Sequence, residues 1–193
     1  MKKLLITGFE PFGNCPKNPS WMAVEALPEQ VGDYALKKLA LPTVFGKAGA
    51  LVLEAAKAFA PDVILCVGQA GGRDAVTPER IAVNIRDARI PDNAGHQPRG
   101  EFVAEDGPAA YFSTVPVIKM AQAIRDREIP ATVSNSAGAY VCNDTLYLLL
   151  HAYAGTDTRV GFIHVPNTPE LGSPSLPLEK IIAALVAAIQ NLD

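Results

Sequence analysis

Two residues far apart in the sequence, a cysteine and a histidine, are the most able to do chemistry. Cys142 lies in SNSAGAYVCND, where small residues lead into the apolar run TLYLLL. That pattern predicts a loop turning into a helix, and the positive end of a helix dipole favours the thiolate. We therefore expect a lowered pKa and a nucleophilic role for Cys142, with backbone amides nearby to hold an oxyanion. The alternative is a buried structural cysteine, as we expect for Cys66.

His164 is the candidate base. It follows the apolar residues 160–163, which predict a buried strand. A histidine at a strand end can take the proton of a cysteine and later give one to a leaving amine. The alternative is a half-buried structural histidine. We expect His151, which lies among leucines, to be structural, and His96, in a polar loop, to be solvated.

A cysteine–histidine pair works better when a third group fixes the tautomer and orientation of the imidazole. The candidates are Asp74, Glu79 and Asp87. Glu79 stands just before an apolar stretch in TPERIAVN, so its carboxylate could be held near the sheet. A surface pairing with an arginine is the simpler interpretation, and these residues alone leave the choice open.

The positions of these residues depend on the elements around them. Short apolar runs predict buried strands at residues 3–7, 63–67, 131–134 and 160–164. Helical spacing predicts helices at residues 20–26, 46–59, 109–126, 143–152 and 177–192. This alternation is typical of an α/β/α sandwich with a mostly parallel, twisted sheet, and we expect residues 1–193 to form one domain. Residues 69–108 lack clear periodicity, which is typical of functional or irregular segments.

Loops that follow the strands of a parallel sheet gather at one edge, where ligands bind. The loops expected there read TGFEPFGN, VGQAGGR, SNSAGAYVCND and HVPNTPE. This arrangement would bring Cys142 and His164 to the same rim. Phe9 and Phe12 would line a flat apolar pocket beside them, or fill the core.

The composition excludes several classes of protein. Charged residues make up 19% and the net charge is -3, without the basic patch of a nucleic-acid-binding protein. No run approaches the roughly 18 to 20 apolar residues that cross a bilayer, and MKKLLITGF lacks a signal-peptide cleavage site. We expect a cytoplasmic protein with neither nucleic-acid nor membrane partners. Three widely spaced cysteines and three histidines predict no disulfide and no metal site. We expect no cofactor.

Six stretches, in order over nearly the whole chain, resemble one family, pyroglutamyl peptidase I. They are TGFEPFG with the following NPS, GQAGGR, ERIAVN, DARIPDN, SNSAGAYVCN and FIHVP. The resemblance implies a cysteine exopeptidase that removes N-terminal pyroglutamate from peptides through a thiol acyl-enzyme. It implies a catalytic set of Glu79, Cys142 and His164, and so selects Glu79 among the three carboxylates. It also implies a homotetramer.

The same resemblance implies a pocket for the five-membered lactam ring, sandwiched by two phenylalanines and closed by polar and apolar walls. Its residues would be Phe9, Phe12, Asn18, Gln69, Arg89, Ile90, Tyr140 and Val141. Arg89 would stand near the reacting carbonyl and help the backbone amides to stabilise the oxyanion. Three positions depart from the family. Tyr140 stands where phenylalanine is usual and brings a hydroxyl that needs a partner if buried. Asn14 replaces a glycine, and Asn167 replaces an aromatic residue.

Two other functions remain open from the residues alone. A nucleoside phosphorylase or hydrolase with the same sheet would bind an anion at the glycines of GQAGGR, although this pattern is neither GxGxxG nor Walker A. That function predicts phosphate dependence and insensitivity to thiol alkylation. A ligand-binding or scaffold protein would bury Cys142 and turn over no acyl substrate.

Overall fold

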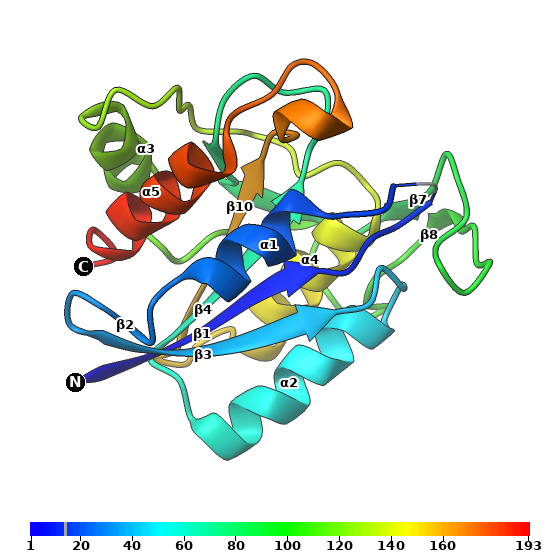
Figure 1. The fold of residues 1–193 in the computed structure, drawn as a ribbon. Coiled ribbons are helices and arrows are strands. Elements are labelled where there is room, and N and C mark those ends of the chain that lie inside the picture. Colours follow the sequence, from blue (N-terminus) through cyan, green and yellow to red (C-terminus); the bar gives the residue numbers. More distant parts are fainter. Residues whose placement is uncertain (14) are drawn as a thin grey trace.

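A six-stranded sheet forms the centre of the fold (Figure 1). The structure is a computed structural model that describes residues 1–13 and 15–193, so the departure at Asn14 lies outside the described residues. The strand order is β2-β3-β1-β4-β10-β5. The strands are β1 (Lys2–Phe9), β2 (Gln30–Val31), β3 (Tyr34–Leu41), β4 (Val63–Gln69), β5 (Thr77–Pro78) and β10 (Arg159–Val165). The four central strands are parallel, and the edge strands β2 and β5 are antiparallel to their neighbours.

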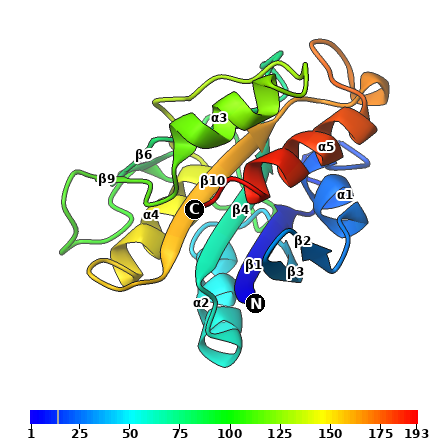
Figure 2. The same ribbon diagram turned by 90° about the vertical axis from the view of Figure 1, so that its left-hand side faces the viewer.

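Helices cover both faces of the sheet, as Figure 2 shows. On one face lie α1 (Pro19–Ala26), α3 (Val117–Arg125) and α5 (Leu178–Ile189), and on the other lie α2 (Lys47–Phe59) and α4 (Val141–Ala152). Successive residues of a strand therefore serve different cores. Leu4 and Ile6 pack with α1, α3 and α5, whereas Leu5 packs with α2 and α4. Burial on both faces explains the continuous apolar runs of the central strands. The predicted α/β/α sandwich is confirmed.

The segment predicted to be irregular contains short two-stranded pairs. Within it, β7 (Arg86–Asp87) pairs with β8 (Arg99–Glu101), and β6 (Ile81–Val83) pairs with β9 (Ala110–Phe112), which follows just after the segment. A short 3-10 helix, η1 (Pro169–Leu171), follows β10. Among the described residues, no helix is long and apolar enough to span a membrane.

Two predicted elements are wrong. Residues 131–134 form no strand of the sheet, because β5 occupies the edge beside β10 and these residues form only isolated bridges to Val76 and Glu79, which flank β5. The helix predicted at 109–126 begins only at Val117, because residues 110–112 pair with β6 as strand β9. Strand β3 was not predicted. Its two central lysines, Lys37 and Lys38, interrupt the apolar run.

Candidate active site

Cys142 is the second residue of α4, at the helix end that faces the carboxyl ends of the strands. The two residues after it anchor that end. Asn143 Oδ1 accepts the Val83 N–H at 2.9 Å and its Nδ2 donates to the Val83 carbonyl at 2.9 Å. Buried Asp144 pairs with Arg86 at 2.5 Å and accepts the Gly46 N–H at 2.7 Å. The thiol therefore sits on a helix terminus held by two polar side chains.

His164 reaches the same face of the sheet from β10. Its register partner on β4 is Gly68, and register partners in adjacent strands project to the same face. A Cβ at Gly68 would lie 2.9 Å from the Cys142 sulfur and 2.8 Å from the ring of Phe162. The absence of a side chain at Gly68 leaves room for the thiol beside the strand that carries His164. The predicted convergence of Cys142 and His164 on one rim agrees with this packing.

Glu79 is the carboxylate that contacts the histidine. Its Oε1 accepts the Nδ1–H of His164 at 2.7 Å, because a carboxylate can only accept. The Glu79 N–H donates to the Phe162 carbonyl at 2.9 Å, which fixes the residue just after β5. The contact leaves Nε2 of His164 as the basic nitrogen. The other two candidates, Asp74 and Asp87, are exposed.

Arg73 completes the buried carboxylate site. Its Nη1 lies 2.5 Å from Glu79 Oε1, and its Nη2 donates to the Ser136 carbonyl at 2.9 Å. Burial raises the pKa of Glu79, but the hydrogen bond and positive charge of His164 and the contact with Arg73 outweigh it, so the pKa lies below its usual value. Glu79 is therefore ionised at neutral pH and can stabilise an imidazolium.

The expected lowering of the Cys142 pKa does not occur. Burial, together with the smaller effect of the negative charge of Glu79, raises the pKa of this thiol to about 12, while Arg73 acts in the opposite direction. At this half-buried position beside Gly68 and Phe162, burial raises the pKa of the thiol by more than the helix terminus lowers it. The resting thiol is neutral, so a base must remove its proton during attack.

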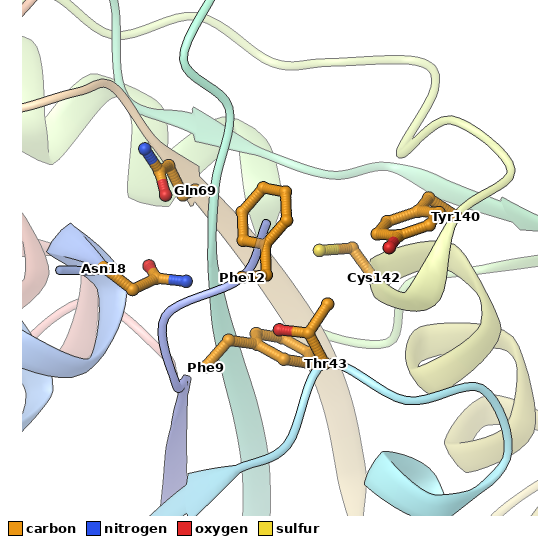
Figure 3. Close-up of a pocket in the computed structure, with 7 residues that line it drawn as sticks. All are labelled: Phe9, Phe12, Asn18, Thr43, Gln69, Tyr140 and Cys142. Carbon is orange, nitrogen blue, oxygen red and sulfur yellow. The ribbon is translucent and has the colours of Figure 1, made fainter. Parts of the chain in front are cut away.

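A small cavity opens beside the thiol (Figure 3). Its volume is about 40 Å³, and its lining residues are Phe9, Phe12, Asn18, Thr43, Gln69, Tyr140 and Cys142. Figure 3 shows the amides of Asn18 and Gln69 on one side and Cys142 with Tyr140 on the other. The described lining contains apolar surface and neutral polar groups without an ionised side chain. Such a cavity fits a compact, neutral group that carries its own donor and acceptor.

The two amides of the cavity are differently engaged. Asn18 caps α1, where its Oδ1 accepts the Ser20 N–H at 3.0 Å, and its Nδ2 donates to the Glu10 carbonyl at 3.1 Å. The amide nitrogen carries two N–H groups, so one N–H of Asn18 has no partner among the described residues. Gln69 Nε2 donates to Asn167 Oδ1 at 2.7 Å. The buried Gln69 Oε1 has no partner among the described residues.

The remaining predicted pocket residues lie outside this cavity. Arg89 and Ile90 are exposed and line a neighbouring groove, which shares Phe12 and Tyr140 with the cavity. Val141 is buried in the core between the sheet and α4. Tyr140 is half-buried, and its hydroxyl donates to the Pro91 carbonyl at 3.0 Å.

Three residues of the site were missed by the sequence reasoning. Thr43 follows β3, a strand that was not predicted, so nothing marked it as a rim residue. Arg73 belongs to GQAGGR, but only Gln69 and the glycines of that stretch were weighed. Asn167 was noted only as a departure. Across residues 1–13 and 15–193, no cluster of three or more His, Cys, Asp or Glu side chains could hold a metal ion.

Comparison with known proteins gives a consistent match over the full chain. The family model described as pyroglutamyl peptidase matches residues 2–192. The pyrrolidone-carboxylate peptidase of Staphylococcus aureus strain Newman is 49% identical over 197 residues, which cover 98% of this chain and 93% of the relative. Pyroglutamyl peptidase I of Bacillus amyloliquefaciens superposes with a TM-score of 0.96 at 44% identity, over 100% of this chain and 97% of that one. For the pyrrolidone carboxyl peptidase of Thermococcus litoralis, the TM-score is 0.95 at 40% identity, over 100% and 93%.

Proposed function

This chain belongs to the pyroglutamyl peptidase family, and we propose that it hydrolyses the bond after an N-terminal pyroglutamyl residue of peptides, with Cys142 as the nucleophile. The observation that carries the proposal is that Cys142 lines a small, uncharged cavity on the face of the sheet that also carries the Glu79–His164 pair.

Substrate selection follows from the lining of the cavity. The lactam ring of pyroglutamate is compact, neutral and partly apolar, so it can pack against Phe9 and Phe12. A free N-terminus carries an ammonium group, and burying that charge without a counter-ion is costly. The lining offers no carboxylate to pair with it. Peptides that begin with pyroglutamate are therefore accepted, and peptides with a charged N-terminus are rejected.

In the first half of the proposed reaction, Nε2 of His164 takes the thiol proton as the Cys142 sulfur attacks the pyroglutamyl carbonyl. The new S–C bond turns the carbonyl oxygen into an oxyanion. Amides in the first turn of α4 have no partner within the helix and can receive that charge. Arg89 is exposed in the groove beyond Tyr140, so we assign the main oxyanion contacts to the backbone.

In the second half, the His164 imidazolium donates its proton to the leaving amine as the C–N bond breaks. A thioester between Cys142 and the pyroglutamyl group remains. His164 then removes a proton from water, which attacks the thioester. The C–S bond breaks, pyroglutamate leaves, and the imidazolium returns its proton to the sulfur to restore the free thiol. Ionised Glu79 orients the imidazole and stabilises its positive form in both halves.

The anion-binding alternative has less support. The space above Gly71 is filled by the Asn167 side chain, since a Cβ there would lie 2.7 Å from Asn167 Oδ1. A phosphate would have to displace that side chain before it could approach the backbone of GQAGGR.

The test is release of a fluorescent amine from a pyroglutamyl amide. Wild type should turn over the substrate, Cys142→Ala should lose measurable turnover, and Cys15→Ala, which alters an exposed thiol, should match wild type. An alanyl amide should remain uncleaved. Equal turnover in Cys142→Ala and wild type would contradict the proposed nucleophile, and no turnover by wild type would contradict the proposed function.

We further propose that the chain forms a single domain over residues 1–193 and assembles as a homotetramer in the cytoplasm. Exposed Phe112 and Ile118, at 68% and 66% accessibility, support an apolar contact between copies. The free thiols of Cys15, Cys66 and Cys142 support a reducing compartment. Light scattering on the purified protein should give four times the mass of one chain, and a monomer mass would contradict the assembly.

A further inference from the structure

Gln69 lines the cavity and carries a buried acceptor. Its Oε1 has no hydrogen-bond partner among the described residues, although neighbouring atoms cover almost all of it. Leaving such an acceptor unpaired costs free energy, so its place in the cavity indicates a partner that arrives with the ligand. Figure 3 shows the amide nitrogen of Gln69 turned away from the ring of Phe12.

The orientation of the Gln69 amide is dictated by its neighbours. The carbonyl of Gly71 can only accept, so the Asn167 atom that faces it at 3.3 Å must be the donor Nδ2. Oδ1 of Asn167 therefore faces Gln69. Because this oxygen can only accept, Gln69 donates to it through Nε2 at 2.7 Å. The Gly71 carbonyl thus fixes the orientation of the Asn167 amide, and Asn167 in turn fixes that of the Gln69 amide. Oε1 of Gln69 is left as the acceptor without a partner among the described residues.

Asn167 is itself firmly placed. Its backbone forms a bridge with Ser175, and its carbonyl accepts the Leu176 N–H at 2.8 Å. Its side chain occupies the space that a Cβ at Gly71 would need, so any other residue at position 71 would push it aside. The side chain that orients Gln69 therefore has little freedom to turn.

We propose that Asn167 is a positioning residue for substrate specificity, which orients Gln69 so that Oε1 accepts the ring N–H of the lactam. This inference rests on the proposed function. The N–H distinguishes a lactam from a ring ketone of the same shape, so the pair selects for the amide character of the ring. Asn167 acts through Gln69 and does not touch the reacting atoms.

The experiment compares two amide substrates that release the same fluorescent amine. One carries pyroglutamate, and the other carries 3-oxocyclopentanecarboxylate, in which a CH₂ group replaces the ring N–H. Wild type should favour the lactam in kcat/KM by about 10- to 100-fold, because the ketone leaves Oε1 unpaired. Asn167→Leu should reduce this preference to within about threefold, mainly by raising KM for the lactam.

Asn167→Asp is the matched variant, because it keeps an oxygen toward Gln69 but sets another against the Gly71 carbonyl. It should retain part of the preference. Thermal melting of each variant separates misfolding from misplacement of Gln69. A wild type that cleaves both substrates equally well overturns the inference without using any variant. A full preference in folded Asn167→Leu also overturns it, and in both cases cleavage of the pyroglutamyl amide still upholds the proposed function.

Discussion

The Glu79 carboxylate lies 2.7 Å from Nδ1 of His164, although 85 residues separate them in the chain. The contact exists because β5, which ends just before Glu79, pairs antiparallel with β10, which carries His164. Arg73 holds the same carboxylate oxygen from the other side at 2.5 Å. A buried carboxylate that is held by Arg73 and accepts a hydrogen bond from His164 is suited to stabilising positive charge on the imidazole during proton transfer.

Removing the charge of Glu79 should slow the reaction without displacing the histidine. Glu79→Gln keeps the size of the side chain but can present its amide N–H₂ to His164 and so favour the wrong tautomer. We expect kcat to fall by about 10²- to 10⁴-fold, as is typical for loss of an orienting carboxylate. Glu170→Gln, which alters an exposed glutamate, should leave kcat within twofold of wild type. Near-normal kcat in Glu79→Gln would show that Glu79 does not orient the base.

The same carboxylate should make the fold sensitive to acid. Folding lowers the Glu79 pKa below its ordinary value near 4.5, so its contribution to the free energy of unfolding is fully present above that pH. The contribution is lost as pH falls through the lower pKa of the folded state. Thermal melting between neutral pH and pH 3 should therefore decline less steeply in Glu79→Gln than in wild type. Parallel curves would mean that the Glu79 pKa is not lowered by folding.

Gly68 should be required for activity because of the space beside it. A methyl group at this position would meet the Cys142 sulfur at 2.9 Å and the Phe162 ring at 2.8 Å. We expect Gly68→Ala to displace the thiol and lower kcat/KM about 100-fold. Gly72→Ala is the matched control, because a Cβ there meets nothing within 4 Å. Similar losses in both variants would argue that glycine is needed for a different reason.

Alkylation should report a neutral resting thiol. Burial raises the pKa of Cys142 to about 12, so the rate of its reaction with iodoacetamide should rise roughly tenfold per pH unit between pH 7 and 10. Cys15 is exposed and reacts as well, so the measurement uses Cys15→Ser and locates the label by peptide mapping. A rate that levels off below pH 8 would instead show a preformed thiolate.

The hydroxyl of Tyr140 should have a structural effect only. It donates to the Pro91 carbonyl at 3.0 Å and so ties the start of α4 to the loop after Ile90. Tyr140→Phe removes one hydrogen bond, and we expect a loss of about 0.5–1.5 kcal/mol in the free energy of unfolding. The KM for a pyroglutamyl amide should change by less than about threefold. A larger change would place the hydroxyl in substrate binding.

The regular parts of the fold could be predicted because their signals are local. Strands β1, β4 and β10 are buried on both faces and read as continuous apolar runs, and four of the five predicted helices are confirmed. Strand β3 was missed because it lies nearer the edge, where Lys37 and Lys38 reach solvent. The short β9 was absorbed into a predicted helix, since three residues carry too little periodicity to be recognised.

The site was less predictable because its contacts are distant in sequence. The contexts of Cys142 and His164 suggested a pair, but only the resemblance to a family selected Glu79 among three carboxylates. The structure adds the physical reason, since Asp74 and Asp87 are exposed and Glu79 is buried against His164. The effect of burial on the Cys142 thiol depends on packing by Gly68 and Phe162, which no helix-start pattern can reveal.

The most direct test of the central claim is to find the acyl group on the thiol. Wild type mixed with a pyroglutamyl ester, quenched in acid within milliseconds and digested, should yield a peptide in which Cys142 carries one pyroglutamyl group. The adduct should be absent from Cys15 and Cys66, and its amount should rise in His164→Ala if that variant still reacts with the ester, because hydrolysis of the thioester needs the base. Product formation with Cys142 unmodified at every quench time would contradict the proposed mechanism.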